Sequence, residues 1–67
     1  MMRSFDKINF NGKLKMAIDH FQMGNDYFHL GKFQEAILAY LLALETDPDE
    51  ADIHYNLGVA YFSLGEF

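Results

Sequence analysis

Three histidines are the side chains in this chain that are best suited to metal binding or acid–base chemistry. His20, His29 and His54 lie far apart in the sequence, and none belongs to a His-Glu-x-x-His pair or a comparably close pair. Zinc sites need ligands that a helix or a short loop brings to one point, and such spacings are the sequence signature of these sites. We therefore expect no bound metal, and His20 and His54 are expected to pack in the core.

The second candidate for chemistry is an acidic stretch over residues 45–52, which contains Asp47, Asp49 and Glu50. A calcium loop needs a glycine at its sixth position, and this stretch has none and contains Pro48 instead. The sequence also has no nucleophile beside a base and no glycine-rich phosphate loop. We expect a turn between helices, no cofactor and no enzymatic activity. A metal-binding or enzymatic protein is the competing interpretation, and only the scattered histidines support it.

The strongest pattern in the sequence is a repeat with a period of 34 residues. Its two copies differ in type at only one of eight matched pairs, Met23 and Leu57. Such a period predicts stacked supersecondary units. The first copy consists of His20, Met23, Gly24, Tyr27, Phe28, Leu30, Gly31 and Phe33, and the second of His54, Leu57, Gly58, Tyr61, Phe62, Leu64, Gly65 and Phe67.

Together with Ala36, Tyr40, Ala43 and Pro48, the first copy resembles a tetratricopeptide repeat, in which His20 stands where the family often has Trp. The resemblance covers one full repeat, residues 17–50, and half of another, residues 51–67. It implies an all-α fold of antiparallel helix-turn-helix units, an α-solenoid fragment with three main helices. Residues 1–12 form an N-terminal appendage to this 13–67 domain.

Local signals predict where the first helix lies. Asn11 can cap a helix over residues 13–30, and Gly31 can supply the left-handed residue that ends it.

Further signals mark the ends of the next two helices. Pro48 ends a helix over residues 33–46. Asp49, followed by Asp52, resembles a capping box and opens a helix over residues 50–64. Gly24 should let the first two helices approach closely at Ala36 and Ala43, with Tyr27 and Tyr40 on the flanks.

The resemblance also implies a concave groove that binds a peptide or a partner's helix. Asn25 and Asn56 match two asparagines of the subfamily that clamps a C-terminal carboxylate, but Phe21 stands where that clamp has a lysine. We therefore expect the two amides to hydrogen-bond a ligand backbone. In the alternative, Phe21, Phe28 and Phe62 simply pack against one another. The predicted groove residues are Ile18, Phe21, Asn25, Phe28, His29, Tyr55, Asn56, Val59 and Phe62.

Two apolar surfaces predict self-association, most simply as a homodimer. Leu38, Leu41 and Leu42 stand at positions that are usually outward and polar in the family. Tyr61 and Leu64 belong to a face whose second helix would begin after the last residue. Two alternatives remain: Phe5, Ile8 and Phe10 fold back over the leucines, or the chain is a piece of a longer scaffold.

The composition of the chain indicates which classes of partner it can bind. The chain has 67 residues, a formal charge of -5 and no cysteine. That charge repels a nucleic-acid backbone, so we expect a protein or peptide partner and no nucleic acid. The longest apolar run, residues 36–44, is about half of what a membrane span needs, and the first residues lack the apolar core of a signal peptide. We expect a cytoplasmic protein that does not enter a membrane.

Overall fold

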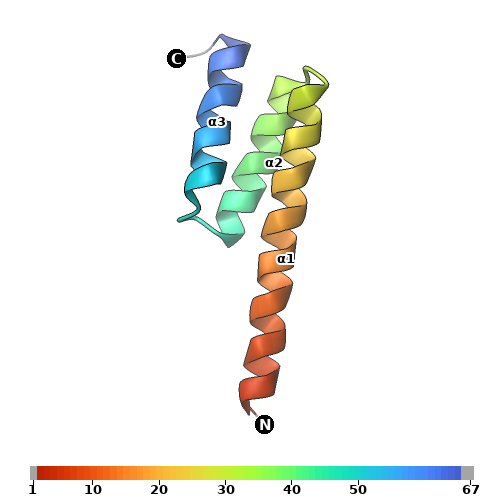
Figure 1. The fold of residues 1–67 in the computed structure, drawn as a ribbon, viewed down its shortest axis with the longest axis vertical. Helices are drawn as coiled ribbons and strands as arrows, with labels where there is room; N and C mark the ends of the chain where they lie inside the picture. The colour runs from red at the N-terminus through yellow and green to blue at the C-terminus, as the bar shows by residue number, and fades with distance from the viewer. Residues whose placement is uncertain (1, 66–67) are drawn as a thin grey trace.

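The computed structural model describes the backbone of residues 2–65 and the side chains of residues 15–65. It consists of three helices, α1 over Met2–His29, α2 over Phe33–Thr46 and α3 over Ala51–Leu64, and residues 2–65 contain no strand. Figure 1 shows α2 running antiparallel to both of its neighbours, so that α1 and α3 point the same way. The predicted all-α class and its three helices are confirmed. Phe67, the last position of the second repeat copy, lies outside the described residues.

Gly31 ends α1 as predicted. Its φ is 78°, in the left-handed region that favours glycine. Two hydrogen bonds close the turn, from the Gly31 N–H to the Phe28 carbonyl at 3.0 Å and from the Lys32 N–H to the Tyr27 carbonyl at 2.9 Å. This is the Schellman arrangement, which satisfies carbonyls at the helix end and reverses the chain. Gly65 repeats the left-handed conformation at the end of α3, with φ 86°.

The predicted start of α1 is wrong, because the helix begins at Met2 and Asn11 lies inside it. Residues 2–12 contain no proline, and Gly12 lowers helix stability by only about 1 kcal/mol, so no strong local signal stops the helix there. The N-terminal part of α1 extends past the ends of α2 and α3 (Figure 1). The expected fold-back of the first residues is not seen in this backbone, which continues as one helix, and the side chains of Phe5, Ile8 and Phe10 lie outside the described residues.

The turn between α2 and α3 differs from the predicted capping box. Glu50 occupies the N-cap position of α3 without a side-chain cap hydrogen bond, which leaves Asp49 one residue too early to cap. Instead, His54 Nε2 lies 2.7 Å from the Pro48 carbonyl oxygen, and since a carbonyl only accepts, this nitrogen carries the proton. His54 is exposed, so its predicted place in the core is wrong, whereas His20 is half-buried.

The core lies around α2. Tyr40 is 1% exposed and is the largest fully buried side chain among the described residues. A Cβ on Gly24 would lie 2.5 Å from Tyr40 Cε1, so the ring lies against Gly24 and not on the flank of the helix crossing as predicted. The buried cluster consists of Ala36, Ile37, Tyr40, Ala43, Ile53 and Ala60. Among the described helices, none is both long enough and apolar enough to cross a membrane.

Candidate interaction groove

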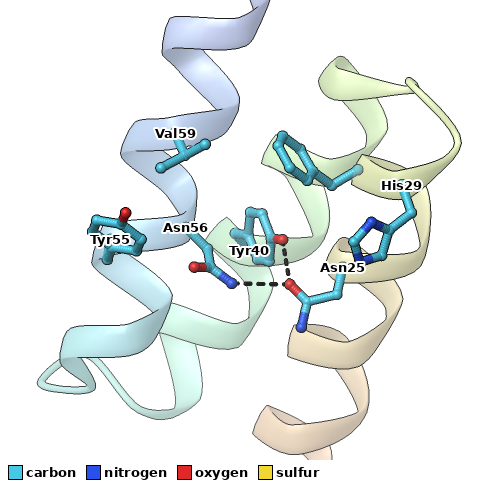
Figure 2. A pocket seen from close by; sticks show the side chains of 7 residues that line it. Asn25, His29, Tyr40, Tyr55, Asn56 and Val59 are labelled. Carbon is cyan, nitrogen blue, oxygen red and sulfur yellow. Dashed lines mark hydrogen bonds between the residues drawn. The ribbon is translucent and has the colours of Figure 1, made fainter.

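A groove with a volume of about 320 Å³ lies where the three helices meet (Figure 2). It forms because α1 and α3 run in the same direction on either side of α2, which supplies the floor between them (Figure 1 and Figure 2). Its lining residues are Asn25, Phe28, His29, Tyr40, Tyr55, Asn56 and Val59.

The centre of the groove is a hydrogen-bond network that joins all three helices. Asn25 Oδ1 accepts a hydrogen bond from the Tyr40 hydroxyl at 2.5 Å and another from Asn56 Nδ2 at 3.0 Å. Burial raises the pKa of the Tyr40 phenol above its ordinary value of 10.0, and the neighbouring Asn56 amide offsets part of that rise. The hydroxyl therefore stays protonated and able to donate at physiological pH.

This network leaves polar atoms for a ligand. An amide oxygen has two lone pairs, and both on Asn25 are occupied. In the part of the chain with described side chains, Asn25 Nδ2 and Asn56 Oδ1 have no hydrogen-bond partner. Figure 2 shows these two atoms turned away from the dashed hydrogen bonds. The groove thus offers one amide donor group and one amide acceptor, the complements of a peptide C=O and N–H.

Apolar side chains flank the polar centre. Tyr55 is 72% exposed and presents its ring at the rim on α3, and Val59 lies one turn further along the same helix. On α1, Phe28 is half-buried, and its ring centroid lies 6.1 Å from that of His29. A ligand can therefore bury apolar side chains on both sides of the amides.

The structure brings six of the nine predicted groove residues together around this cavity. Ile18 and Phe21 line a second depression of about 260 Å³, shared with Asp47, Glu50 and Asp52. Phe62, 65% exposed, lines neither. Tyr40 is the lining residue that the sequence interpretation missed, because its repeat position indicated only a contact between helices. The six are Asn25, Phe28, His29, Tyr55, Asn56 and Val59.

Phe21 and Phe28 pack within the molecule, but against other rings and not, as in the alternative, against each other. The Phe21 ring lies 5.9 Å from that of Tyr40, and the Phe28 ring lies 5.3 Å from that of Phe33. Both phenylalanines pack against the buried cluster. They are thus partly core residues.

The outer leucines are exposed, as predicted. Leu38 is 63% exposed, and Leu41, Leu42 and Tyr61 are also exposed, whereas Leu64 is half-buried. Leu38 borders two shallow apolar depressions. One lies against Tyr61 and Leu64 of α3, and the other against Met23 and Tyr27 of α1.

Metal ligands do not converge in the described residues. Among residues 15–65, no group of three or more His, Cys, Asp or Glu side chains is placed to hold a metal ion. The buried Nδ1 of His20 has no hydrogen-bond partner among these residues. None of the groove-lining residues is Lys or Arg, which does not favour a carboxylate clamp.

Antiparallel helix pairs with a groove between successive first helices define a helical-repeat protein. The chain belongs to the tetratricopeptide family, because the family model described as TPR repeat matches residues 24–65. A relative, RNA polymerase II-associated protein 3 of Xenopus laevis, is 37% identical over 51 residues, which is 76% of this chain. That match spans only 8% of the length of the relative. No solved structure matches the chain. Membership of this family indicates a module for protein–protein interaction.

Proposed function

We propose that the chain is a non-enzymatic interaction module that binds an extended peptide segment of a partner in the groove between α1 and α3. The observation that carries this proposal is the pair of free amide atoms, Asn25 Nδ2 and Asn56 Oδ1, beside the apolar rim. An extended segment has unpaired backbone N–H and C=O groups to offer, whereas a helix has already paired them. The groove therefore favours an extended ligand over a helical one.

The negative charge of the chain indicates which peptide segments the groove should prefer. The chain carries a formal charge of -5, and the depression next to the groove contains Asp47, Glu50 and Asp52. Complementary potentials favour association, so the preferred segment carries no net negative charge. The same charge disfavours nucleic acid. The absence of cysteine supports a cytoplasmic location for the module.

Selection of peptides from a displayed random library, followed by fluorescence anisotropy on the selected sequences, tests the groove. Tyr55→Ala should weaken binding about tenfold or more if Tyr55 is a hot spot, and Asn56→Ala should also weaken it. Tyr61→Ala is the matched control, because it removes the same ring from the same helix outside the groove lining. Selected peptides that bind equally well to the Tyr55 and Asn56 variants would contradict the proposal.

A second proposal is self-association, supported by the exposed Leu38, Leu41, Leu42 and Tyr61. Isolated exposed apolar residues are common, but these leucines lie on one helix next to two apolar depressions. Fully burying one leucine contributes roughly 1.5 to 3 kcal/mol, so a symmetric contact that uses several of them twice can exceed the ordering cost of association. Light scattering across a concentration series measures the solution mass.

The chain can also serve as one segment of a longer scaffold. The match to 8% of a relative supports this alternative, since the relative is much longer than the matched segment. A scaffold segment would still present the α1–α3 groove, so the peptide experiment applies to it unchanged.

A further inference from the structure

The channel between α1 and α3 continues from the groove into a second depression of about 260 Å³. On α1, Phe21 of this depression lies about one helical turn before Asn25 of the groove, and on α3 Asp52 lies about one turn before its asparagine. The Phe21 ring centroid also lies 5.9 Å from that of Tyr40, which lines the groove. We call this depression the acidic subsite. Its lining residues are Ala17, Ile18, Phe21, Asp47, Glu50, Asp52 and Ile53.

The floor of the acidic subsite is apolar. Ala17 is 4% exposed and Ile53 is 2% exposed, and Phe21 is half-buried. Lys and Arg side chains combine an aliphatic stem, which packs on apolar surface, with a charged end group that stays near water. The floor can therefore hold the stem of a basic side chain.

Three carboxylates surround this floor. Asp47 is half-buried, and Glu50 and Asp52 are exposed. Among the described side chains, none of the three carboxylates has a hydrogen bond or an ion pair, and no Lys or Arg lines the subsite. A cation that enters the subsite is therefore attracted by three negative charges that no described cation neutralises.

We propose, on the basis of the proposed peptide-binding function, that the acidic subsite binds a Lys or Arg side chain of the extended peptide in the groove. The stem lies on Ala17, Phe21 and Ile53, and the charged end group reaches the carboxylates. An acidic side chain at the same place is repelled. The subsite thus provides selectivity among peptides, which the two groove amides lack because they bind only the peptide backbone.

The spacing of the two depressions determines where in the segment the basic residue stands. About one helical turn, roughly 5 to 6 Å, separates the groove amides from the acidic subsite along the helix axes. In an extended segment, residues two apart point to the same face and lie about 6.6 Å apart. The basic residue should therefore stand two positions from the residue that Asn25 and Asn56 bind. A shift by one position turns its side chain to the opposite face.

The probes are peptides selected against the wild-type chain from a displayed random library. Lys or Arg should be enriched at one position. Replacing that residue by norleucine keeps an aliphatic stem and removes the charge, and it should weaken binding about fivefold in fluorescence anisotropy, the upper range for an exposed ion pair. Moving the basic residue by one position should weaken binding at least as much. These changes are made in the peptide, so they do not affect the folding of the chain.

A matched pair of chain variants tests the carboxylates, with circular dichroism to check that both fold. The subsite variant should bind the basic peptide about fivefold more weakly and the norleucine peptide as the wild type does. The control variant removes the same charge from exposed residues outside both depressions, and it should affect the two peptides equally. The subsite variant combines Asp47→Asn, Glu50→Gln and Asp52→Asn. The control variant combines Asp26→Asn, Glu35→Gln and Glu45→Gln.

The outcomes separate this proposal from that for the groove. Selected peptides without an enriched basic position, or equal weakening of the basic peptide by the two triple variants, would overturn the acidic subsite. The groove would still stand in that case if Tyr55→Ala weakens binding. Peptides that bind the Tyr55→Ala and Asn56→Ala variants as tightly as the wild type would overturn both proposals, since the subsite acts on a peptide held in the groove.

Discussion

Gly24 and Gly58 occupy the same place in the two repeat copies, but their surroundings differ. The buried Tyr40 ring lies where a Cβ on Gly24 would go, whereas no described atom lies within 4 Å of a Cβ on Gly58. Gly24→Ala should therefore lower the free energy of unfolding relative to Gly58→Ala by about 1 to 3 kcal/mol, because the ring must move. Gly58→Ala should raise that free energy by up to about 1 kcal/mol through helix propensity. Urea unfolding measures both, and equal effects would show that Tyr40 repacks freely.

The Tyr40 hydroxyl links the core to the groove. Tyr40→Phe removes its hydrogen bond to Asn25 Oδ1 and keeps the ring. We expect the free energy of unfolding to fall by about 0.5 to 1.5 kcal/mol, the usual contribution of one hydrogen bond. Guanidinium unfolding at neutral pH measures this change. An unchanged midpoint would mean that the hydroxyl contributes nothing to the stability of the helix arrangement.

Tyr40 also predicts a pH dependence. Since burial raises its pKa in the folded state above 10.0, the folded chain holds this proton at a pH where the unfolded chain has lost it. The resulting stability is fully present below pH 10.0 and is lost as the pH rises through the folded pKa. Unfolding free energies between pH 8 and pH 11 should fall more in the wild type than in Tyr40→Phe. If the unfolding free energies of the two proteins fall equally with pH, groups other than Tyr40 cause the loss of stability at alkaline pH.

At the scale of elements, α1 has two parts with different surroundings. Its C-terminal part packs against α2, and its N-terminal part extends past both other helices (Figure 1). Deleting residues 1–12 should reduce the far-UV helical signal, because isolated helical segments of this length are marginal in water. The free energy of unfolding should change by no more than about 0.5 kcal/mol, as for other changes away from the core.

This deletion also tests the proposed boundary between an appendage, residues 1–12, and a domain, residues 13–67. Circular dichroism gives the helical signal, and its loss with urea gives the free energy. A fall of more than about 1 kcal/mol would place the first residues within the cooperative unit.

At the scale of the whole molecule, the fold is elongated and thin. Its principal extents are 50 × 20 × 13 Å, and α2 is the helix that packs against both of the others. Three helices that pack mainly through α2 cannot bury apolar residues on all of their faces. This shape explains why large apolar side chains such as Leu38 and Tyr55 remain exposed while the core is built around α2.

The exposed apolar side chains predict that the thermal stability of the chain depends on protein concentration. If the proposed dimer forms, its thermal midpoint should rise with protein concentration, because mass action favours the associated state. Leu38→Glu combined with Leu42→Glu should give a monomer with a midpoint independent of concentration. Both leucines are exposed, so the fold should tolerate the change. A wild type that is monomeric at every concentration would contradict self-association.

Local signals in the sequence determined the period, the fold class and most of the helix ends. The predicted range 33–46 coincides with α2, and the prediction for α3 began one residue early. The left-handed conformation at Gly31 also followed from the sequence. These features depend on backbone sterics, helix propensity and hydrophobic spacing within a few residues. They can therefore be predicted from short segments of the sequence.

Only the tertiary structure decided how side chains on different helices meet. Asn25 and Asn56 are 31 residues apart, and their hydrogen bond and that of Tyr40 depend on the rotation of three helices about their axes. Two predicted helix caps were wrong. Asn11 lies inside α1, which starts at Met2, and His54 contacts Pro48 in the turn where Asp49 was expected to cap α3. Asn and Asp can cap a helix, but they do not require a helix to start there. The groove is thus a product of packing, where small offsets in helix position determine which polar atoms remain free.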